Sequence, residues 1–333
     1  MTDLAALAKW LPSQGLTLAP GTGLTRLSGG IANRNDRFDL TTGAAVLRRP
    51  PPGVLAAGAS DMAREWRVVS NLAPHFPIVP RGLAYCDDAA ILGTPFLILE
   101  HRPGIAIGGT LPPGADANAL LDAALTQMVA LHALSPAAIG LGDLGKPEGF
   151  YPRQLRGWTQ RAAAVWEAGA PAAALIAALA ASPPPDDPTP VLLHMDLKPD
   201  NLLVDPVTMA PQAMIDWDMA TRGPRGFDLA ILLSYWIEPG DPIAVHALNA
   251  VPSLHNALTR SGIIARYTAL GGTAPGPLAW PTALARLRLA TAWMQLYRKW
   301  QRGEMTGNRY AGFQTLALAI LDHALDQFTK ERQ

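Results

Sequence analysis

Residues 194–201 read HMDLKPDN, and this stretch is the most informative part of the chain. Short apolar runs at 191–193 and 202–204 flank it, which predicts a loop between two strands. Asp196 and Asn201 are five positions apart, so a tight loop can direct both side chains into one cleft. A carboxylate can accept a hydroxyl proton, and an amide oxygen can bind a metal ion.

A further carboxylate, Asp216, follows fifteen residues after Asn201, at the end of an apolar run in MIDWD (214–218). Phosphoryl transfer requires a group that positions the attacking oxygen, ligands for Mg²⁺, and a cation that offsets charge on the moving phosphate. Mg²⁺ commonly keeps several waters, so one carboxylate and one amide suffice from the protein. The spacing therefore indicates a phosphoryl-transfer site.

The pattern along the chain predicts a small sheet-rich part, a break at HRPG (101–104) and a larger helical part. In the first part we expect a short helix at 4–11, strands at 25–28, 33–40, 45–48, 82–85 and 95–99, and a helix from about 61 to 72. In the second we expect helices at 117–134, 152–168, 226–236, 254–267, 282–302 and 311–328, with strands at 191–193, 202–204 and 213–215.

HMDLKPDN resembles the catalytic loop H-R-D-L-K-P-x-N of protein kinases. The Met after His194, and IDWD in place of D-F-G, are instead similar to the aminoglycoside phosphotransferase and choline kinase branch of that superfamily. LSGGIAN (27–33) resembles the phosphate-covering loop of this branch. VLRRPPPG (46–53), MARE (62–65) and DWDMAT (216–221) resemble a subgroup that includes the kinase-like domain fused ahead of some acyl-CoA dehydrogenases. The resemblance covers residues 24–236.

This resemblance implies an α+β, protein-kinase-like bilobal fold. Residues 1–100 would form the nucleotide-binding N-lobe, a small antiparallel sheet with one main helix. Residues 101–104 would be the hinge, and residues 105–333 a larger, mostly helical C-lobe with the catalytic loop and the acceptor site.

The resemblance also implies a role for each matching residue. Asp196 is expected to be the catalytic base or hydroxyl positioner, and Lys198 to neutralise the γ-phosphate of ATP. Asn201 and Asp216 are expected to hold Mg²⁺. The expected nucleotide-binding residues are Ser28, Gly29, Gly30 and Asn33 in the phosphate-covering loop, Arg48 on the third strand with its partner Glu65, and the backbone near Glu100 and Arg102 beside the adenine. We expect His194 to support the loop and Asp228 to hold its backbone.

Arg48 departs from the kinase pattern, which has a lysine at this position. Arginine binds phosphate as a planar fork and is not interchangeable with lysine. The resembling subgroup also uses arginine there, and we expect Arg48 to contact the phosphates. Arg49 is the alternative, one residue along the strand.

Composition limits the possible partners. Lys+Arg and Asp+Glu both number 27 in 333 residues, which argues against binding to a nucleic-acid backbone. One cysteine, Cys86, excludes a disulfide framework. The longest apolar run has about ten residues, half of what a bilayer span needs, and no secretory signal is evident. We expect a cytoplasmic protein that acts on a small molecule, without nucleic acid or membrane; its oligomeric state stays open.

The sequence gives less information about the phosphate acceptor. Residues 105–333 hold 19 acidic and 17 basic residues, which gives no support for the acidic pocket that a polycationic aminoglycoside needs. Arg298, Lys299, Arg302 and Arg309 could bind an anionic acceptor such as a hydroxy acid or its coenzyme A ester, or could form a solvated helix face. The leading hypothesis is an ATP- and Mg²⁺-dependent small-molecule kinase. The alternatives are an aminoglycoside kinase and a non-catalytic nucleotide-binding scaffold.

Overall fold

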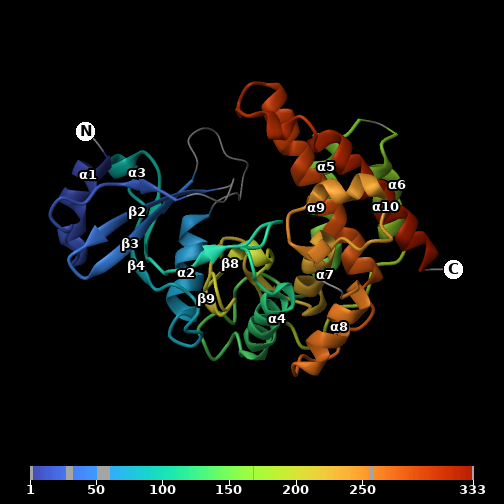
Figure 1. Ribbon diagram of the computed structural model, residues 1–333, viewed down its shortest axis with the longest axis horizontal. Helices are drawn as coiled ribbons and strands as arrows, with labels where there is room; N and C mark the ends of the chain where they lie inside the picture. Colours follow the sequence, from blue (N-terminus) through green and yellow to red (C-terminus); the bar gives the residue numbers. More distant parts are fainter. Residues whose placement is uncertain (1–2, 28–32, 51–60, 168, 256–257, 332–333) are drawn as a thin grey trace.

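The computed structural model describes residues 3–27, 33–50, 61–167, 169–255 and 258–331. A five-stranded antiparallel sheet with helices on both faces forms one end of the molecule, and a larger helical part forms the other (Figure 1). The sheet order is β1-β2-β3-β5-β4. Its strands are β1 Thr25–Arg26, β2 Arg34–Leu40, β3 Gly43–Arg49, β4 Gly82–Cys86 and β5 Phe96–Glu100.

The two faces of this sheet are covered by different helices. One face packs on α1 (Asp3–Trp10) through a buried cluster that includes Leu7, Leu47 and Phe96. The other face packs on α2 (Met62–Leu72), where Val68, Leu72 and Leu97 belong to the main core. Because alternate strand residues point to opposite faces, neighbouring residues of β3 serve different clusters.

Helix α2 begins directly after Asp61, close to the start expected from the sequence. The Asp61 side chain accepts a hydrogen bond from the Arg64 backbone N–H at 3.0 Å, which satisfies one of the free donors of the first turn. Glu65 is thereby held in the first turn of α2, on the side that faces the sheet, and only 1% of it is exposed.

The helical part contains two small sheets. β7 (Val191–Leu193) pairs with β10 (Thr221–Gly223), and β8 (Leu202–Val204) lies between β6 (Ile105–Ala106) and β9 (Pro211–Met214). The chain between β7 and β8 is therefore short and held at both ends. It includes a 3₁₀ turn at Pro199–Asn201.

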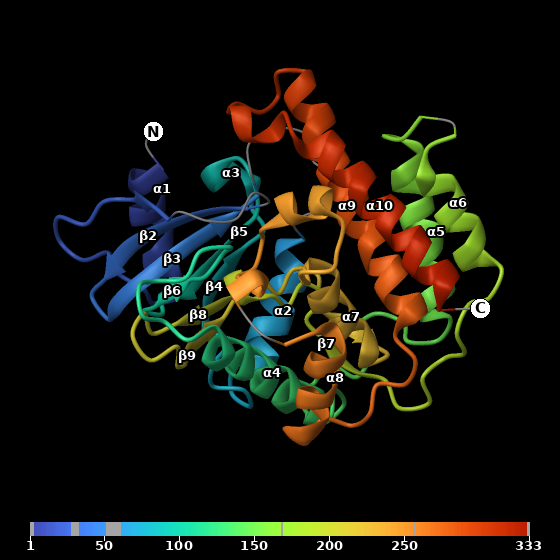
Figure 2. The ribbon, with the colours of Figure 1, turned by 45° about the vertical axis from the view of Figure 1, so that its right-hand side comes forward.

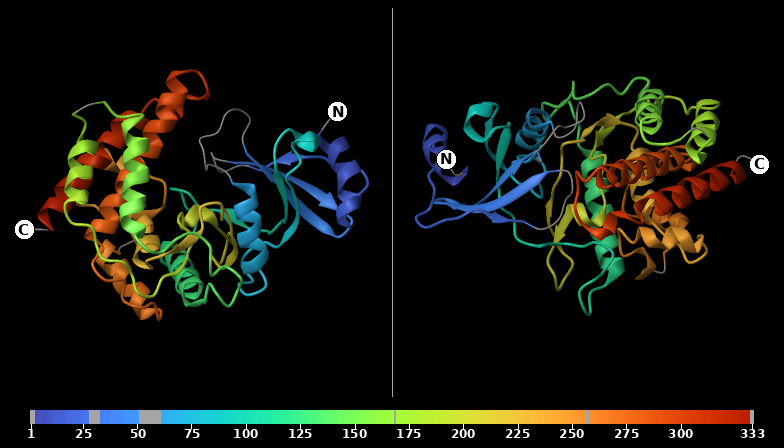
Figure 3. Two further views of the ribbon diagram at one scale, coloured as in Figure 1. Left: turned by 180° about the vertical axis from the view of Figure 1, so that it is seen from behind. Right: turned by 90° about the horizontal axis from the view of Figure 1, so that it is seen from above.

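Helices pack around these sheets, and α9 and α10 run side by side, with α5 and α6 beyond them in Figure 2. Seen from behind, α5 and α2 lie on the same face of the molecule, with the short strands between them (Figure 3). The remaining helices are α3 Ala89–Leu92, α4 Ala117–Ala133, α5 Phe150–Ala163, α6 Pro171–Ala180, α7 Gly226–Tyr235, α8 Arg260–Ala269, α9 Ala279–Gln301 and α10 Phe313–Lys330.

The element pattern expected from the sequence is largely present, with five differences. The short helix α3 was not expected. Helix α6 was not expected, although it coincides with the longest apolar run. Helix α8 begins at Arg260 instead of 254, because the Thr259 side chain caps it through the Gly262 backbone N–H. Helix α5 spans Phe150–Ala163 and ends five residues before the expected 168. The short strands β6 and β10 were not expected either.

No helix within the described ranges has both the length and the apolar character needed to cross a bilayer.

Candidate functional site

The loop between β7 and β8 is fixed by Asp228 of α7. This fully buried carboxylate accepts hydrogen bonds from the backbone N–H groups of His194 and Met195, at 2.8 and 2.7 Å. Its second contact, to His132 at 3.3 Å, ties it to α4. Met195 has φ 71°, a left-handed conformation that costs free energy in a residue other than glycine. Asp228 thus holds the loop backbone in a conformation that it would not adopt alone.

Asp196 lies among three nitrogen donors. Its carboxylate is 2.6 Å from Lys198 Nζ, 3.0 Å from Asn201 Nδ2 and 3.7 Å from the Arg288 guanidinium. Burial alone would raise the pKa of Asp196, but Lys198 and Arg288 hold it below its ordinary value. The carboxylate is therefore ionised and can accept a hydrogen bond from a hydroxyl group.

Asn201 is oriented by the same loop. Its Nδ2 also donates to the Asp196 backbone carbonyl at 2.8 Å, so the amide nitrogen is committed to Asp196. No hydrogen bond to Oδ1 of Asn201 is found among the described residues, which leaves this oxygen for a metal ion.

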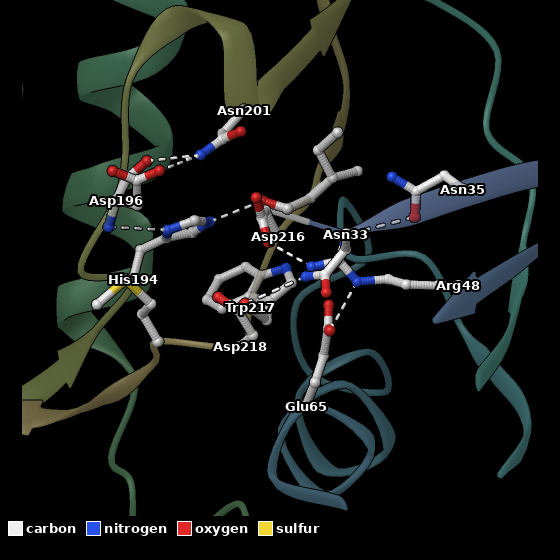
Figure 4. A network of polar contacts seen from close by, with 12 residues as sticks. Asn33, Asn35, Arg48, Glu65, His194, Asp196, Asn201, Asp216, Trp217 and Asp218 are labelled. Atoms are coloured by element: carbon white, nitrogen blue, oxygen red, sulfur yellow. Dashed lines mark hydrogen bonds and ion pairs between the residues drawn. The ribbon is translucent and has the colours of Figure 1, made fainter. Parts of the chain in front are cut away.

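Asp216 is brought beside the loop by backbone and histidine contacts. The Ile215 N–H donates to the Asn201 carbonyl at 3.0 Å, and His194 Nε2 lies 2.9 Å from the Ile215 carbonyl. Asp216 itself has φ 71°, which turns its carboxylate away from the strand direction and toward β3. Figure 4 shows Asp196 and Asn201 in contact with each other on the loop, and Asp216 on the neighbouring segment facing Arg48.

Arg48 of β3 reaches the same place from the sheet. Its Nε donates to Glu65 at 2.7 Å, its Nη2 pairs with Asp216, and its side chain is only 7% exposed (Figure 4). Arg49 points to the opposite face and pairs with Asp3 and Asp36. Of the two arginines that the sequence left as alternatives, Arg48 is the one at the site.

The carboxylates around Arg48 outnumber the cations. Glu65, Asp216 and Asp218 all face this one guanidinium and raise its pKa despite burial. Burial and the Asp216 charge raise the pKa of Asp218 from 3.8 to about 6. The Asp216 carboxylate and the Asn201 amide oxygen are of the kinds that Mg²⁺ binds in proteins, so these two residues fit that ion in chemistry. Among the described residues, no group of three or more His, Cys, Asp or Glu side chains is placed to hold a metal ion.

Asn33 completes the site on the β2 side. Its Nδ2 donates to Asp218 at 3.2 Å, and its Oδ1 is buried without a hydrogen-bond partner among the described residues. An unsatisfied buried amide oxygen is costly, which suits a position that receives a ligand donor. Ser28, Gly29 and Gly30, expected beside it, lie outside the described residues.

Glu100 is the last residue of β5, and Arg102 lies two residues beyond it. The Glu100 carboxylate contacts Arg81 at 3.3 Å and Arg102 at 3.2 Å, and Arg102 also donates to the Pro77 carbonyl at 2.9 Å. These side chains hold the connection between the two parts of the molecule. The contact of their backbone with adenine stays a prediction.

Two residues of the site have no counterpart in the sequence predictions. Asp218 lies two residues beyond Asp216 and was given no role, although the spacing D-x-D was visible. Arg288 comes from the middle of α9, and its guanidinium donates to the Met195 carbonyl 93 residues away in sequence. Arg286 and Arg288 both lie among apolar residues of this helix, and nothing in the local sequence marks Arg288 as the one that makes this contact.

The basic residues proposed for an anionic acceptor lie elsewhere. Arg298 contacts Glu167 at 3.4 Å, Arg302 pairs with Glu304, and Arg309 lies over the Tyr310 ring. Their charges are partly offset by these neighbours. Within the part of the chain that the structure describes, no hydrogen bond, ion pair or ring contact joins these three residues or Lys299 to the loop at 194–201.

The raised pKa of Asp218 predicts a pH effect on stability. Folded Asp218 binds a proton up to about pH 6, whereas the unfolded chain releases it near pH 4. Relative to high pH, the protonation of Asp218 therefore adds to the free energy of unfolding. This contribution is complete below about pH 4 and is lost as the pH rises through about 6. In metal-free protein, the free energy of unfolding in urea should vary less with pH over this window in Asp218→Asn than in wild type. An equal pH dependence of the free energy of unfolding in the two proteins would contradict the raised pKa of Asp218.

Comparison with known proteins places the chain in a family. Residues 23–261 match the pattern of the APH phosphotransferase enzyme family, which is well over half of the chain. The chain belongs to the APH family. The family expected from the motifs is therefore confirmed.

Solved APH structures share this fold. A Ralstonia eutropha protein, described as a candidate aminoglycoside phosphotransferase, aligns with a TM-score of 0.79 at 23% identity over 98% of each chain. Aminoglycoside phosphotransferase APH(4)-Ia aligns with a TM-score of 0.64 at 18% identity over 97% of this chain and 99% of its own. One APH(4)-Ia structure is a ternary complex with ADP and hygromycin B. At these identities the likeness shows the fold, and it confirms the expected α+β kinase-like class.

Curated relatives with this APH segment are much longer than the chain. Mouse acyl-CoA dehydrogenase family member 10 is 30% identical over 245 residues, 72% of this chain and 23% of that protein. Rat member 11 is 33% identical over 214 residues, 62% of this chain and 27% of that protein. The chain thus spans about a quarter of the length of these relatives, and it is similar to the subgroup expected from the sequence.

Proposed function

We propose that this protein is an ATP- and Mg²⁺-dependent phosphotransferase that moves the γ-phosphate of ATP to a hydroxyl of a small molecule. The observation that carries the proposal is the convergence of Asp196, Asn201 and Asp216 with the Arg48–Glu65 pair (Figure 4). These groups come from the loop between β7 and β8, the segment that follows β9, and the elements β3 and α2. Together they supply a hydroxyl acceptor, metal-binding oxygens and a fixed cation.

Each residue has a role in direct in-line transfer. Asp196 accepts the hydrogen bond of the attacking hydroxyl and takes its proton. The new oxygen–phosphorus bond forms as the bond between the γ-phosphorus and ADP breaks, and ADP leaves. Asn201 Oδ1 and Asp216 would hold Mg²⁺, which supplies positive charge at the β- and γ-phosphates. Lys198 and Arg48 offset the charge that develops on the transferred group.

The nucleotide would lie between residues 1–100 and residues 105–333, with 101–104 as the hinge. Ser28, Gly29, Gly30 and Asn33 would cover the phosphates, and the backbone of Glu100 to Arg102 would meet the adenine. Structures of family members in complex with ADP and with AMP-PNP support ATP as the phosphate donor.

The acceptor that we propose is anionic, a hydroxy acid or its coenzyme A ester. The similarity to acyl-CoA dehydrogenase family members supports acyl chemistry. The cations Lys198 and Arg288 beside Asp196 favour an anion over a polycationic aminoglycoside. The scaffold alternative is disfavoured because Asp196 and Asp216 are both retained and both lie at the site.

Mg²⁺-dependent ATP consumption across an acceptor panel tests this function. The panel holds aminoglycosides, choline-like amines, sugars, hydroxy acids and hydroxyacyl-CoA esters. We expect turnover with an anionic hydroxyl compound, and none when EDTA removes the metal. If only the aminoglycosides support turnover, the proposal of an anionic acceptor is wrong and the acceptor is an aminoglycoside. The absence of both turnover and Mg·AMP-PNP binding would contradict the function itself.

A further inference from the structure

A cavity of about 250 Å³ lies next to the catalytic loop, between α2, α5 and the segment after Asp216. Its lining includes Arg64 of α2, Arg153, Trp158 and Arg161 of α5, and the loop residue Met195. Met195 directly precedes Asp196 in the chain, so the cavity adjoins the proposed phosphoryl-transfer site. None of the three lining arginines was given a role above.

These arginines contact only neutral acceptors. Arg64 Nε donates to the Ala220 carbonyl at 3.1 Å, and Arg161 Nη1 to the Gly157 carbonyl at 3.2 Å. Arg153 donates to two backbone carbonyls that precede α5. Among the described residues no carboxylate lies within ion-pair distance of any of the three, and the remaining residues of the chain include no Asp or Glu. The cavity therefore gathers three uncompensated positive charges in a chain whose total charge is zero.

The cavity also has an aromatic wall. Trp158 is 9% exposed, and the Arg161 guanidinium lies over its ring, 5.0 Å from the centroid. Such a pair fixes the guanidinium plane and leaves its N–H groups for a ligand. Trp158 offers an apolar surface to a short carbon chain.

Arg288 connects this cavity to the catalytic carboxylate. It lies 6.0 Å from the Trp158 ring centroid, donates to the Met195 carbonyl and is 3.7 Å from Asp196. The same buried side chain thus lies beside Trp158 and Met195, which both line the cavity, and beside Asp196. A molecule held in the cavity would lie close to Asp196.

We infer that this cavity binds the anionic end of the phosphate acceptor, a carboxylate or a phosphate, and so directs the acceptor hydroxyl toward Asp196. The inference rests on the proposed function. Guanidinium groups bind both anions through paired N–H donors. A volume of about 250 Å³ accommodates the anionic group and a few carbon atoms, so the rest of a larger acceptor would extend beyond it. Three guanidinium groups would also repel an aminoglycoside.

Equilibrium dialysis with ³²P-labelled inorganic phosphate tests this site directly. Mg·AMP-PNP at saturation fills the nucleotide site, so that phosphate reports only on other anion sites. We expect one bound phosphate per chain, with a Kd that rises at least tenfold in Arg161→Gln and further in Arg153→Gln/Arg161→Gln. Arg156→Gln, an exposed arginine on α5 outside the cavity lining, is the matched control and should leave the Kd unchanged. Competition by acetate and by methyl phosphate distinguishes a carboxylate site from a phosphate site.

Arg161→Gln alone keeps the test valid if the double variant unfolds, because the Arg161 side chain is exposed and bonds only within its own helix. Phosphate binding that survives Arg161→Gln unchanged would overturn the inference. The inference would also be overturned if wild-type protein bound Mg·AMP-PNP but no phosphate. That result would leave the proposed nucleotide site intact. Loss of Mg·AMP-PNP binding in wild type would instead contradict the proposed function.

Kinetics give the second readout. For a hydroxy acid and its neutral amide, Arg161→Gln should raise the KM of the acid about tenfold and leave the KM of the amide and of ATP unchanged. Equal effects on acid and amide would contradict an anion-binding role.

Discussion

Asp196→Asn is expected to lower kcat by about 10²–10⁴-fold, which is the range for loss of a positioned general base. The amide has the size of the carboxylate but cannot take the hydroxyl proton. The Asp196 carboxylate is ionised because Lys198 and Arg288 hold its pKa low, so its function should persist well into the acid range. The affinity for Mg·AMP-PNP should change little, since Asp216 and Arg48 do not depend on Asp196 for their contacts, and Asn201 keeps its hydrogen bond to the backbone carbonyl of residue 196.

Asp200→Asn is the matched control for this variant. Asp200 lies 3.6 Å from Lys198, so its removal also takes a negative charge away from that lysine. We expect kcat to stay within a few-fold of wild type in Asp200→Asn. Similar losses in the two variants would mean that local charge matters and that Asp196 has no specific role. Full activity in Asp196→Asn would refute its assignment.

Arg48→Met is expected to cost about 3–5 kcal/mol of the free energy of unfolding. Arg48 has hydrogen bonds to Glu65 and Asp216, and its loss leaves two buried or half-buried carboxylates without their cation. Mg·AMP-PNP binding should fall as well, because Arg48 is the cation proposed to contact the phosphates. Urea unfolding and AMP-PNP titration measure the two effects separately.

The double variant Arg48→Met/Glu65→Gln separates stability from binding. Glu65 is 1% exposed, so neutralising it removes the larger part of the uncompensated buried charge. We expect the double variant to recover part of the stability lost in Arg48→Met, without recovery of nucleotide binding. If binding returned together with stability, Arg48 would be a structural residue only.

The sequence predicted those parts of the site that depend on local geometry. Asp196 and Asn201 share one short loop, so their spacing alone indicates that they meet. Arg48 and Glu65 lie 17 residues apart, and their meeting follows from which face of β3 and of α2 is buried. The motif resemblance predicted that Arg48 pairs with Glu65. Because alternate strand residues point to opposite faces of the sheet, Arg49 points away from the site.

The remaining contacts could not be predicted, for physical reasons. Arg288 reaches Asp196 only because α9 packs against α7 and α5, and this tertiary packing has no local pattern. Helix α6 is a run of alanine and leucine, which suits a buried helix or a linker-flanking apolar segment equally well. The strands β6 and β10 have two and three residues, too few to show a period.

The most direct test of the account is transfer of label from [γ-³²P]ATP to the acceptor found in the panel, by wild type and by Asp196→Asn at saturating Mg·ATP. The account predicts acid-stable labelled acceptor from wild type, no labelled protein, and a rate about 10²–10⁴-fold lower in the variant. Equal rates of labelling in the two proteins would contradict the central role of Asp196. So would label that accumulates on the protein itself.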